Sequence, residues 1–593
     1  MTPPHSPPLS MVAAAFGTIA IATAFAIAAH AEDPSVEATR QEAAQWRAER
    51  RIIDLHMHIP AEEERLQRAT KIMDAAGIGI GANLSGDITV PKIGRTPPFQ
   101  KNKEATDALM PRRFVYYMNL DYSGWDDPDF SERAVRQIEE GYRLGAAGLK
   151  EYKRLGLYLR DGSGALIKID DPKLDPVWKR CGELGMPVSI HVADPKAFWE
   201  PYDPGNERWV ELKDHKSWWF GDPEKYPSRE ALLDARNRVV ERHPETTFVC
   251  VHFANNPEDI DWVDQSLDRY PNMMVDIAAR VPELGRHDPA KVRALFEKHQ
   301  DRIFFATDFM VYGKLILGSG GDGPGPSDAD AVGFYEKHWR WFETNDRQFA
   351  HMTPIQGDWK IDAIGLPAPV LRKIYFDNAH KLLVRSLPPP TLKAKRIDAD
   401  FEIDGKLDDG SWAGADVARI DYHIRTGEAF PEISTAAQVL WSDKFLYLGY
   451  SAPYSKLTTF EPPLAAGEPD RLGLWERDVV EAFIGTDPAN ANAYTEYEIA
   501  PTGETLDLTL PDKNFGWSSG FTAAVQVDEA AQTWTTEVRI PLAALANEAP
   551  KPGETVWRLN LYRHSTAEKA FIGWSPTASN TAHTPARFGY LSF

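Results

Sequence analysis

The sequence predicts a (β/α)8 TIM barrel followed by an antiparallel β-sandwich. After residue 50, short apolar, β-branched runs alternate with amphipathic segments, as expected for strands that alternate with helices. Eight runs can be counted, at residues 51–58, 78–85, 114–121, 146–152, 186–192, 246–253, 273–279 and 302–309. Eightfold alternation over about 330 residues is typical of a parallel barrel. An open doubly wound sheet is the alternative, but no Gly-rich phosphate loop follows any run.

The second observation is a change of pattern at the proline run SLPPPTL, residues 386–392. Beyond it the helical periodicity is lost, and short strand-like runs recur with Gly, Asn or Asp between them, which is typical of a sandwich. We therefore predict a barrel domain over residues 32–385, a semi-rigid linker over 386–392 and a sandwich domain over 393–593.

The N-terminus carries an apolar segment, residues 11–29, that leads into the small-x-small pattern Ala29-His30-Ala31. This pattern predicts a signal peptide over residues 1–31 and a periplasmic or extracellular location. No Lys or Arg precedes the apolar segment, so an uncleaved membrane anchor is the alternative. The formal net charge of -21 argues against nucleic acid or an anionic membrane surface as a partner.

Polar side chains lie at the carboxyl ends of several predicted strands, where barrel enzymes place their chemistry. His56 and His58 end the first run, and since side chains alternate along a strand, both imidazoles should lie on one face. The ends of the fourth, fifth, sixth and eighth runs carry Lys150, His191, His252 and Asp308. Two histidines alone could be ordinary surface or core residues, but this constellation indicates a divalent metal site.

At these residues the sequence resembles the amidohydrolase superfamily, and more narrowly its amidohydrolase-related (amidohydrolase 2) branch. The matching segments, within about residues 50–385, are DLHMH, GLK, SIHVAD, VHFANNPEDIDWV, YPNMMVDIAAR, FFATDF and GLPAPVLRKIYFDNAHKLL. The resemblance implies one or two divalent ions, zinc or manganese, held by His56, His58, His191 and Asp308. It also implies that His252 polarises the substrate or binds a second ion. Lys150 is then either a carboxylated lysine that bridges two ions or a cation that faces a substrate carboxylate.

The chemistry expected of such a site is hydrolysis. A divalent ion lowers the pKa of a bound water from about 15.7 to about 7 and polarises a carbonyl. Asp308 is the carboxylate best placed to accept the water proton, and His252 could stabilise the developing oxyanion. The alternative for Asp308 is a helix N-cap after the last strand.

A long aromatic-rich excursion, residues 193–227, follows the fifth predicted strand. A loop of this length at the catalytic face of a barrel is usually functional. Aromatic rings separated by polar residues suit a sugar or arene face, and the predicted substrate-binding residues are Trp199, Tyr202, Trp218 and Trp219. Alternatively, these rings fold the excursion into its own small cluster or bury a subunit contact.

The second domain resembles the family 9 carbohydrate-binding modules and their DOMON-like relatives. The matching segments are FEIDGKLDDGSWAGA, FLYLGYSA, LWERDVVEAFIG, YTEYEIAPTGETLDL, RIPLAAL and HTPARFGYLSF. Such modules hold a sugar between aromatic rings, so the resemblance implies a carbohydrate ligand. The candidates in or next to turn-like segments are Trp475, Trp517 and Trp574. Trp441, Trp534 and Trp557 lie inside strand runs and are expected in the core.

Three functions fit these observations. The first is a periplasmic or secreted metal-dependent hydrolase of carbohydrate catabolism that cleaves a lactone, ester, amide or glycosidic bond in a sugar-derived substrate. The second is a metal-dependent decarboxylase or other lyase of the same superfamily branch, which the sugar module and the signal peptide disfavour. The third is a glycan-binding protein with an inactive barrel, which the intact ligand set disfavours. The expected partner is a carbohydrate or a sugar-derived small molecule, without stable membrane association once the N-terminal segment is cleaved.

Overall fold

The computed structural model describes residues 34–84, 99–386, 389–464, 470–487, 490 and 492–593. The predicted signal peptide lies outside these residues, as do two positions of the predicted linker. Among the described helices, none combines the length and the apolar character that crossing a bilayer requires.

Eight parallel strands form the first domain, and the predicted barrel is confirmed. They are β1 (Ile53–His58), β2 (Ile80–Asn83), β3 (Phe114–Tyr116), β4 (Leu149–Glu151), β5 (Val188–Ile190), β6 (Phe248–Cys250), β7 (Met273–Asp276) and β8 (Ile303–Phe304). The strands pair in two arcs, β1 to β3 and β4 to β8. A parallel bridge between Met118 and Leu149 joins the arcs on one side, and the Leu55 N–H donates to the Phe305 carbonyl at 3.1 Å on the other.

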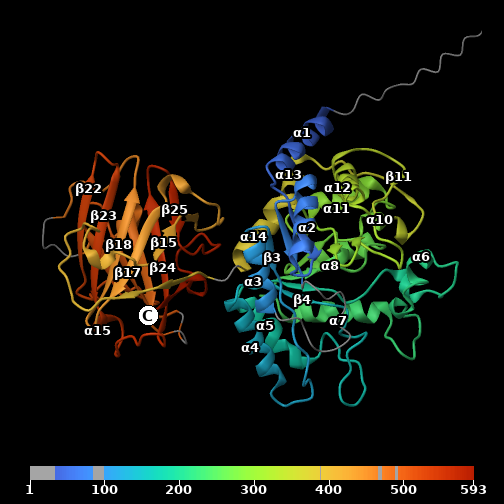
Figure 1. Ribbon diagram of the computed structural model, residues 1–593, viewed down its shortest axis with the longest axis horizontal. Coiled ribbons are helices and arrows are strands. Elements are labelled where there is room, and N and C mark those ends of the chain that lie inside the picture. The colour runs from blue at the N-terminus through green and yellow to red at the C-terminus, as the bar shows by residue number, and fades with distance from the viewer. Residues whose placement is uncertain (1–33, 85–98, 387–388, 465–469, 488–489, 491) are drawn as a thin grey trace, which may run out of the picture.

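Helices follow the strands and cover the barrel (Figure 1). The main ones are α2 (Glu63–Ala76), α3 (Phe99–Leu109), α4 (Phe130–Arg143), α5 (Asp175–Glu183), α7 (Arg229–Arg242), α9 (Ile260–Arg269), α11 (Pro289–Lys298) and α12 (Asp328–Glu343). Local sequence sets their ends. α2 ends at Gly77, whose φ of 83° a side chain would strain, and α12 begins with a capping box between Ser327 and Asp330.

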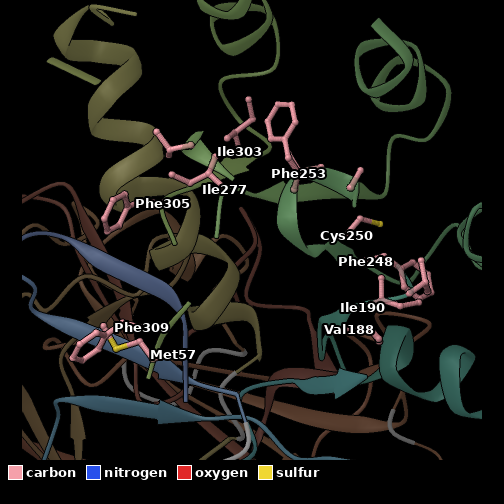
Figure 2. Close-up of a cluster of buried hydrophobic side chains, with 14 of the residues drawn as sticks. Met57, Val188, Ile190, Phe248, Cys250, Phe253, Ile277, Ile303, Phe305 and Phe309 are labelled. Atoms are coloured by element: carbon pink, nitrogen blue, oxygen red, sulfur yellow. The ribbon is translucent and has the colours of Figure 1, made fainter. Parts of the chain in front are cut away.

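One large buried cluster joins the barrel strands to the surrounding helices. Strand residues of this cluster that Figure 2 labels include Met57, Ile190, Phe248, Ile303 and Phe309. Both faces of each strand are covered, which is why the runs read as nearly continuous apolar sequence.

The second domain is a sandwich of an eight-stranded and a six-stranded sheet, as predicted. The eight-stranded sheet contains β13 (Thr391–Lys393), β26 (Gly589–Ser592), β24 (Val556–Ser565), β19 (Val479–Gly485), β20 (Tyr494–Ile499) and β21 (Thr505–Leu510), with β16 (Tyr422–His423) and β25 (Ala570–Gly573) at one side. The six-stranded sheet contains β14 (Lys395–Arg396), β17 (Thr435–Trp441), β18 (Phe445–Pro453), β23 (Thr533–Pro541), β22 (Thr522–Asp528) and β15 (Val417–Ile420). Trp441, Trp534 and Trp557 are buried in the core, as expected. Thr391 and Leu392, predicted as linker, already pair with β26, because an extended segment next to prolines can still use its free N–H groups in a ladder.

The two domains meet at the ends of α4 and of α14 (Asn378–Ser386). The buried Arg587 of the sandwich donates to the Tyr142 hydroxyl and to the Val384 carbonyl, each at 3.2 Å. Barrel helices run opposite to the strands, so their C-terminal ends lie at the amino end of the barrel. The sandwich therefore docks at the end opposite to the strand carboxyl ends, and Figure 1 shows α6 (Trp209–Leu212) of the aromatic excursion on the far side of the barrel from it.

Candidate metal centre

His56 and His58 lie on the same face of β1 and point at one carboxylate. The Nε2 atoms of His56 and His58 lie 3.5 and 3.4 Å from Asp308 Oδ1. Both imidazoles are buried. The i, i+2 spacing alone produces this shared direction, as the sequence predicts.

Asp308 follows β8, and its backbone does not have the extended conformation of a strand. Its φ is 61°, and its N–H donates to the His56 carbonyl at 2.9 Å. The next element is a hairpin of β9 (Phe309–Val311) and β10 (Leu315–Leu317), so the alternative role of Asp308 as a helix N-cap is wrong. Within the described part of the chain, its buried Oδ1 has no hydrogen-bond partner.

His252 lies beyond the end of β6 in a short left-handed turn, α8 (Val251–Ala254). Residues 252–255 all have φ between 53° and 55°, which costs about 1–2 kcal/mol for each non-glycine residue. Three hydrogen bonds hold this turn: Asp276 Oδ1 accepts from the His252 N–H at 2.7 Å, Arg236 donates to the Ala254 carbonyl at 2.8 Å, and Arg229 donates to the Asn255 carbonyl at 2.6 Å. Strain held in place by such contacts is typical of a functional site.

The tautomers of two histidines follow from their partners. The Nδ1 of His252 lies 2.8 Å from the Ala278 carbonyl, which can only accept, so this nitrogen carries the proton. The Nδ1 of His56 lies 2.9 Å from the carboxylate of Asp276 and is protonated for the same reason. Both Nε2 atoms are then acceptors, as metal ligands must be. His56, His252 and Asp308 each offer a ligand atom, and these atoms lie within 4.8 Å of one another.

His191 lies beside this group without joining it. Its ring centroid is 4.5 Å from that of His252, but its Nε2 lies 3.1 Å from the Ala193 carbonyl and 3.4 Å from Asp194 Oδ1. Asp194 in turn forms a short ion pair with Lys153.

Burial dominates the ionisation of the site. It lowers the pKa of His56, His58 and His252 well below the usual value and that of His191 to about 4. Nearby Lys150 lowers the pKa of all four imidazoles further. These imidazoles are neutral at neutral pH, which is the form that binds a metal.

Lys150, on β4, is wholly buried at the same cavity. Its Nζ has no hydrogen-bond partner among the described residues and lies 5.5 Å from the centroid of the Tyr152 ring. Burial lowers the pKa of Lys150 to about 8 and raises that of Asp308 to about 7. An amine with this pKa is partly neutral at physiological pH.

The group opens into a cavity of about 440 Å³ at the carboxyl ends of the strands. Its walls include His191, Lys150, Arg280 and, from the excursion, Trp218. The other three predicted substrate-binding residues do not line this cavity: the indoles of Trp199 and Trp219 donate to the Pro227 and Glu200 carbonyls, and the hydroxyl of Tyr202 donates to the Leu212 carbonyl. Their polar atoms hold the excursion together.

Sequence reasoning gave no role to Asp54 or Arg280. Asp54 accepts from the Thr307 N–H and the His56 N–H, each at 3.1 Å, and from the Tyr335 hydroxyl at the same distance, so it ties β1 to the segment before Asp308. The sequence does contain a signal for Asp54: it lies two residues before His56 and four before His58, so all three side chains should lie on the same face of the strand. Arg280 is brought to the cavity by the turn after β7, for which the sequence offers no comparable signal.

The three tryptophans predicted to bind carbohydrate lie in different environments. Trp475 is 41% exposed, and its ring centroid lies 6.3 Å from that of Phe515. Trp517 is half-buried. Trp574 packs in the sandwich core and is only 8% exposed, so it cannot stack on a sugar unless the core repacks. The turn-like sequence around Trp574 does not reveal this burial, because the residues that cover it come from other parts of the chain.

Comparisons with known proteins agree with this architecture. A family model described as Amidohydrolase matches residues 53–385, and one described as Carbohydrate family 9 binding domain-like matches residues 403–593. A protein of Arthroderma benhamiae named "Extracellular protein" is 26% identical over 170 residues, which cover 26% of this chain and 73% of that protein.

Among solved structures, amidohydrolase 2 from Bifidobacterium longum subsp. infantis is 12% identical, with a TM-score of 0.27, and the match covers 48% of this chain and 89% of that one. A family 9 carbohydrate-binding module from Caldicellulosiruptor kristjanssonii, solved in complex with glucose, is 16% identical, with a TM-score of 0.26, and the match covers 34% of this chain and 94% of that one.

Proposed function

The chain belongs to the amidohydrolase family and carries a C-terminal carbohydrate-binding module, and from this premise we propose that it is a secreted or periplasmic metal-dependent hydrolase of a carbohydrate-derived substrate. The bond cleaved is a lactone, ester, amide or glycosidic bond. The observation that carries this proposal is the convergence of His56, His252 and Asp308 at a cavity.

The ligand atoms of this site fit a divalent cation. The Nε2 of His56 has a lone pair and no proton, and no donor among the described residues reaches the buried Asp308 Oδ1, yet the two atoms lie 3.5 Å apart. Two buried acceptors that face each other are unfavourable unless a proton or a metal cation lies between them. His58 Nε2 lies 3.4 Å from the same oxygen and His252 also offers a ligand atom, and a metal can bind several such ligands at once whereas one proton cannot. Imidazole nitrogen together with carboxylate oxygen is the ligand set of zinc, with manganese as the alternative.

There are two candidate ligand sets. The first, which we infer from the sequence, is His56, His58 and Asp308 with His191; the second replaces His191 with His252, whose ligand atom lies within 4.8 Å of those of His56 and Asp308. With two ions, carboxylated Lys150 would supply the bridge, and with one ion its ammonium would bind a substrate carboxylate.

When bound, the cation supplies a Lewis acid and a more acidic water. Asp308, whose pKa burial raises to about 7, is suited to take a proton from the attacking water and to return it to the leaving group. Asp276 holds His56 and the His252 backbone in position, and the cations of Lys150 and Arg280 at the cavity wall stabilise negative charge on the substrate.

A decarboxylase is the second candidate, and the buried cations at the cavity favour it. Lys150 and Arg280 are buried at the cavity and would hold the substrate carboxylate that a decarboxylase requires. The exposed Trp475 and the family of the second domain favour a carbohydrate ligand and hence the hydrolase.

Metal analysis followed by a product screen tests the proposal. The purified protein should contain zinc or manganese, hydrolyse at least one of a panel of sugar lactones, acylated sugars, amides and oligosaccharides, and lose turnover on chelation. Full activity in a chelated, metal-free sample would refute the metal-dependent mechanism. Release of carbon dioxide without hydrolysis would establish the lyase instead.

A further inference from the structure

A second cavity lies directly beside the catalytic one. It has a volume of about 650 Å³ and lies among β10, residues 318–326, the first half of α12 and residues 352–355. We call it the apolar groove. The two cavities share Lys314, Ser319, Gly320 and Gly321 in their walls, so a single backbone segment separates them.

The hairpin that begins after Asp308 forms part of both walls. On β10, Ile316 lines the catalytic cavity, whereas Leu315 and Leu317 on either side of it line the apolar groove. This division follows from the alternation of side chains along a strand. The segment after β10 is held by Lys314, whose Nζ donates to the Gly323 carbonyl at 2.9 Å and to the Gly321 carbonyl. Part of the groove is thus built on the hairpin that directly follows Asp308.

The lining of the groove suits an apolar ligand. The apolar part of its wall is formed by Val210, Leu315, Leu317, Phe334, Met352 and Ile355, and the charged residues Lys213, Asp214, Lys314, Asp330 and Lys337 also line it. Val210, on α6, is 51% exposed and adds apolar surface to the groove. A volume of about 650 Å³ lies within the range of small-molecule sites, roughly 300–1,000 Å³, and is small for a protein segment.

A glycine keeps the groove open on its helical side. Gly333 lies in the interior of α12, where glycine is less stable than alanine. Apart from its two chain neighbours and the backbone of its own helix, no described heavy atom lies within 4 Å of the position that its Cβ would occupy, so packing does not require the absence of a side chain. Gly333 lines the groove, and a side chain there would occupy it.

We propose that the apolar groove binds an aryl or alkyl group of the substrate while the bond attached to that group reacts beside Asp308. This inference rests on the proposed hydrolase function and narrows it. The substrate class becomes a sugar derivative joined to an apolar group, such as an aryl or alkyl ester, amide or glycoside, rather than a free sugar or a plain lactone.

Binding of the uncharged naphthalene dye Prodan tests the groove independently of turnover. The full-length wild-type protein should shift the dye emission to the blue and saturate. Gly333→Leu, which favours the helix and fills the groove, should weaken binding about tenfold. Glu336→Leu is the matched control, because it adds the same side chain to an exposed position of α12 outside the groove and should leave binding unchanged. Equal affinity of wild type and Gly333→Leu would overturn the proposal.

A matched substrate pair connects the groove to catalysis. On the benzyl and methyl esters of one sugar acid, Gly333→Leu should lower kcat/KM about tenfold more for the benzyl ester than for the methyl ester. An equal loss on both esters would overturn the proposal, because it would indicate a general defect. Absence of turnover on every substrate, with dye binding intact and sensitive to Gly333→Leu, would instead count against the hydrolase function and leave the groove as a binding site.

Discussion

The barrel and the sandwich both bury carboxyl groups, but the neighbours of these groups differ. In the barrel, the imidazoles of His56 and His58 face one oxygen of the Asp308 carboxylate at the wall of a cavity. In the sandwich, Glu481 lies opposite Glu498 on β19 and β20, with Glu496 two residues along the same strand. Burial raises the pKa of Glu496 to about 7 and those of Glu481 and Glu498 well above the usual value, so these acids can keep their protons. Burial raises the pKa of Asp308 as it raises that of Glu496, so burial alone does not indicate a metal site; the convergence of imidazoles on a carboxylate at a cavity does.

The largest expected effect is at Asp308. The Asp308→Asn variant should fold and lose at least about a hundredfold in kcat, because it removes both a general base and a charged ligand. Asp264→Asn is the control, since Asp264 belongs to a second His/Asp group, with Asp268 and His299, that lies nearer the surface. Steady-state kinetics with circular dichroism measure both. If Asp308→Asn were as active as wild type, Asp308 would not be a catalytic residue. The buried carboxylate of the barrel would then have no more of a catalytic role than the buried acids of the sandwich.

Metal content decides the role of Lys150. If its amine is carboxylated and bridges two ions, elemental analysis should give about two metals per wild-type chain and about one in Lys150→Ala. Lys153→Ala is the control, because Lys153 lines the same cavity but is paired with Asp194. A ratio near one in all three proteins would assign Lys150 to substrate binding.

Sugar binding should depend on Trp475 and be independent of the barrel. In the full-length protein, Trp475→Ala should weaken carbohydrate binding, followed by tryptophan fluorescence, by about tenfold or more, since stacking on an exposed indole is lost. Trp517→Ala tests the second candidate, and Trp574→Phe is a core control. The sandwich docks at the amino end of the barrel, so Trp475→Ala should spare turnover of small substrates while weakening action on polymers. A loss on small substrates would mean that the sandwich contributes to the catalytic cavity.

The smallest expected effect is the pH dependence of Glu496. Its pKa is raised from 4.5 to about 7 in the folded protein, so the stability it contributes is full below pH 4.5 and is lost as the pH rises through 7. Glu496→Gln should therefore melt about 3 °C or more above wild type at pH 8, and the difference should vanish at pH 4. Glu402→Gln, at a carboxylate that is 91% exposed, should track wild type at both pH values. A difference in melting temperature that does not change with pH would show that Glu496 keeps no proton.

Much of this architecture could be predicted from local patterns. Eightfold alternation, the sandwich and the shared face of His56 and His58 all follow from periods of two or 3.6 residues, which are properties of neighbouring positions. The positions of Lys150 and His191 at strand ends follow in the same way. The strand bounds are shorter than the apolar runs, because β5 and β6 each pair over three residues and the chain then turns.

The sequence by itself determined the two domains, the order of the polar residues at the strand ends and the direction of the first two histidines. Only the tertiary structure decided how His252 and Asp308 approach them, because both have left-handed backbone conformations that no strand pattern predicts. Hydrogen bonds from residues far along the chain, such as Asp276 to His252, hold such a conformation against its cost. Tertiary packing also decided that Trp475 is exposed whereas Trp574 is buried, and that the sandwich docks through Arg587 away from the catalytic end. Burial and docking depend on neighbours in space, and residues far apart in sequence supply those neighbours.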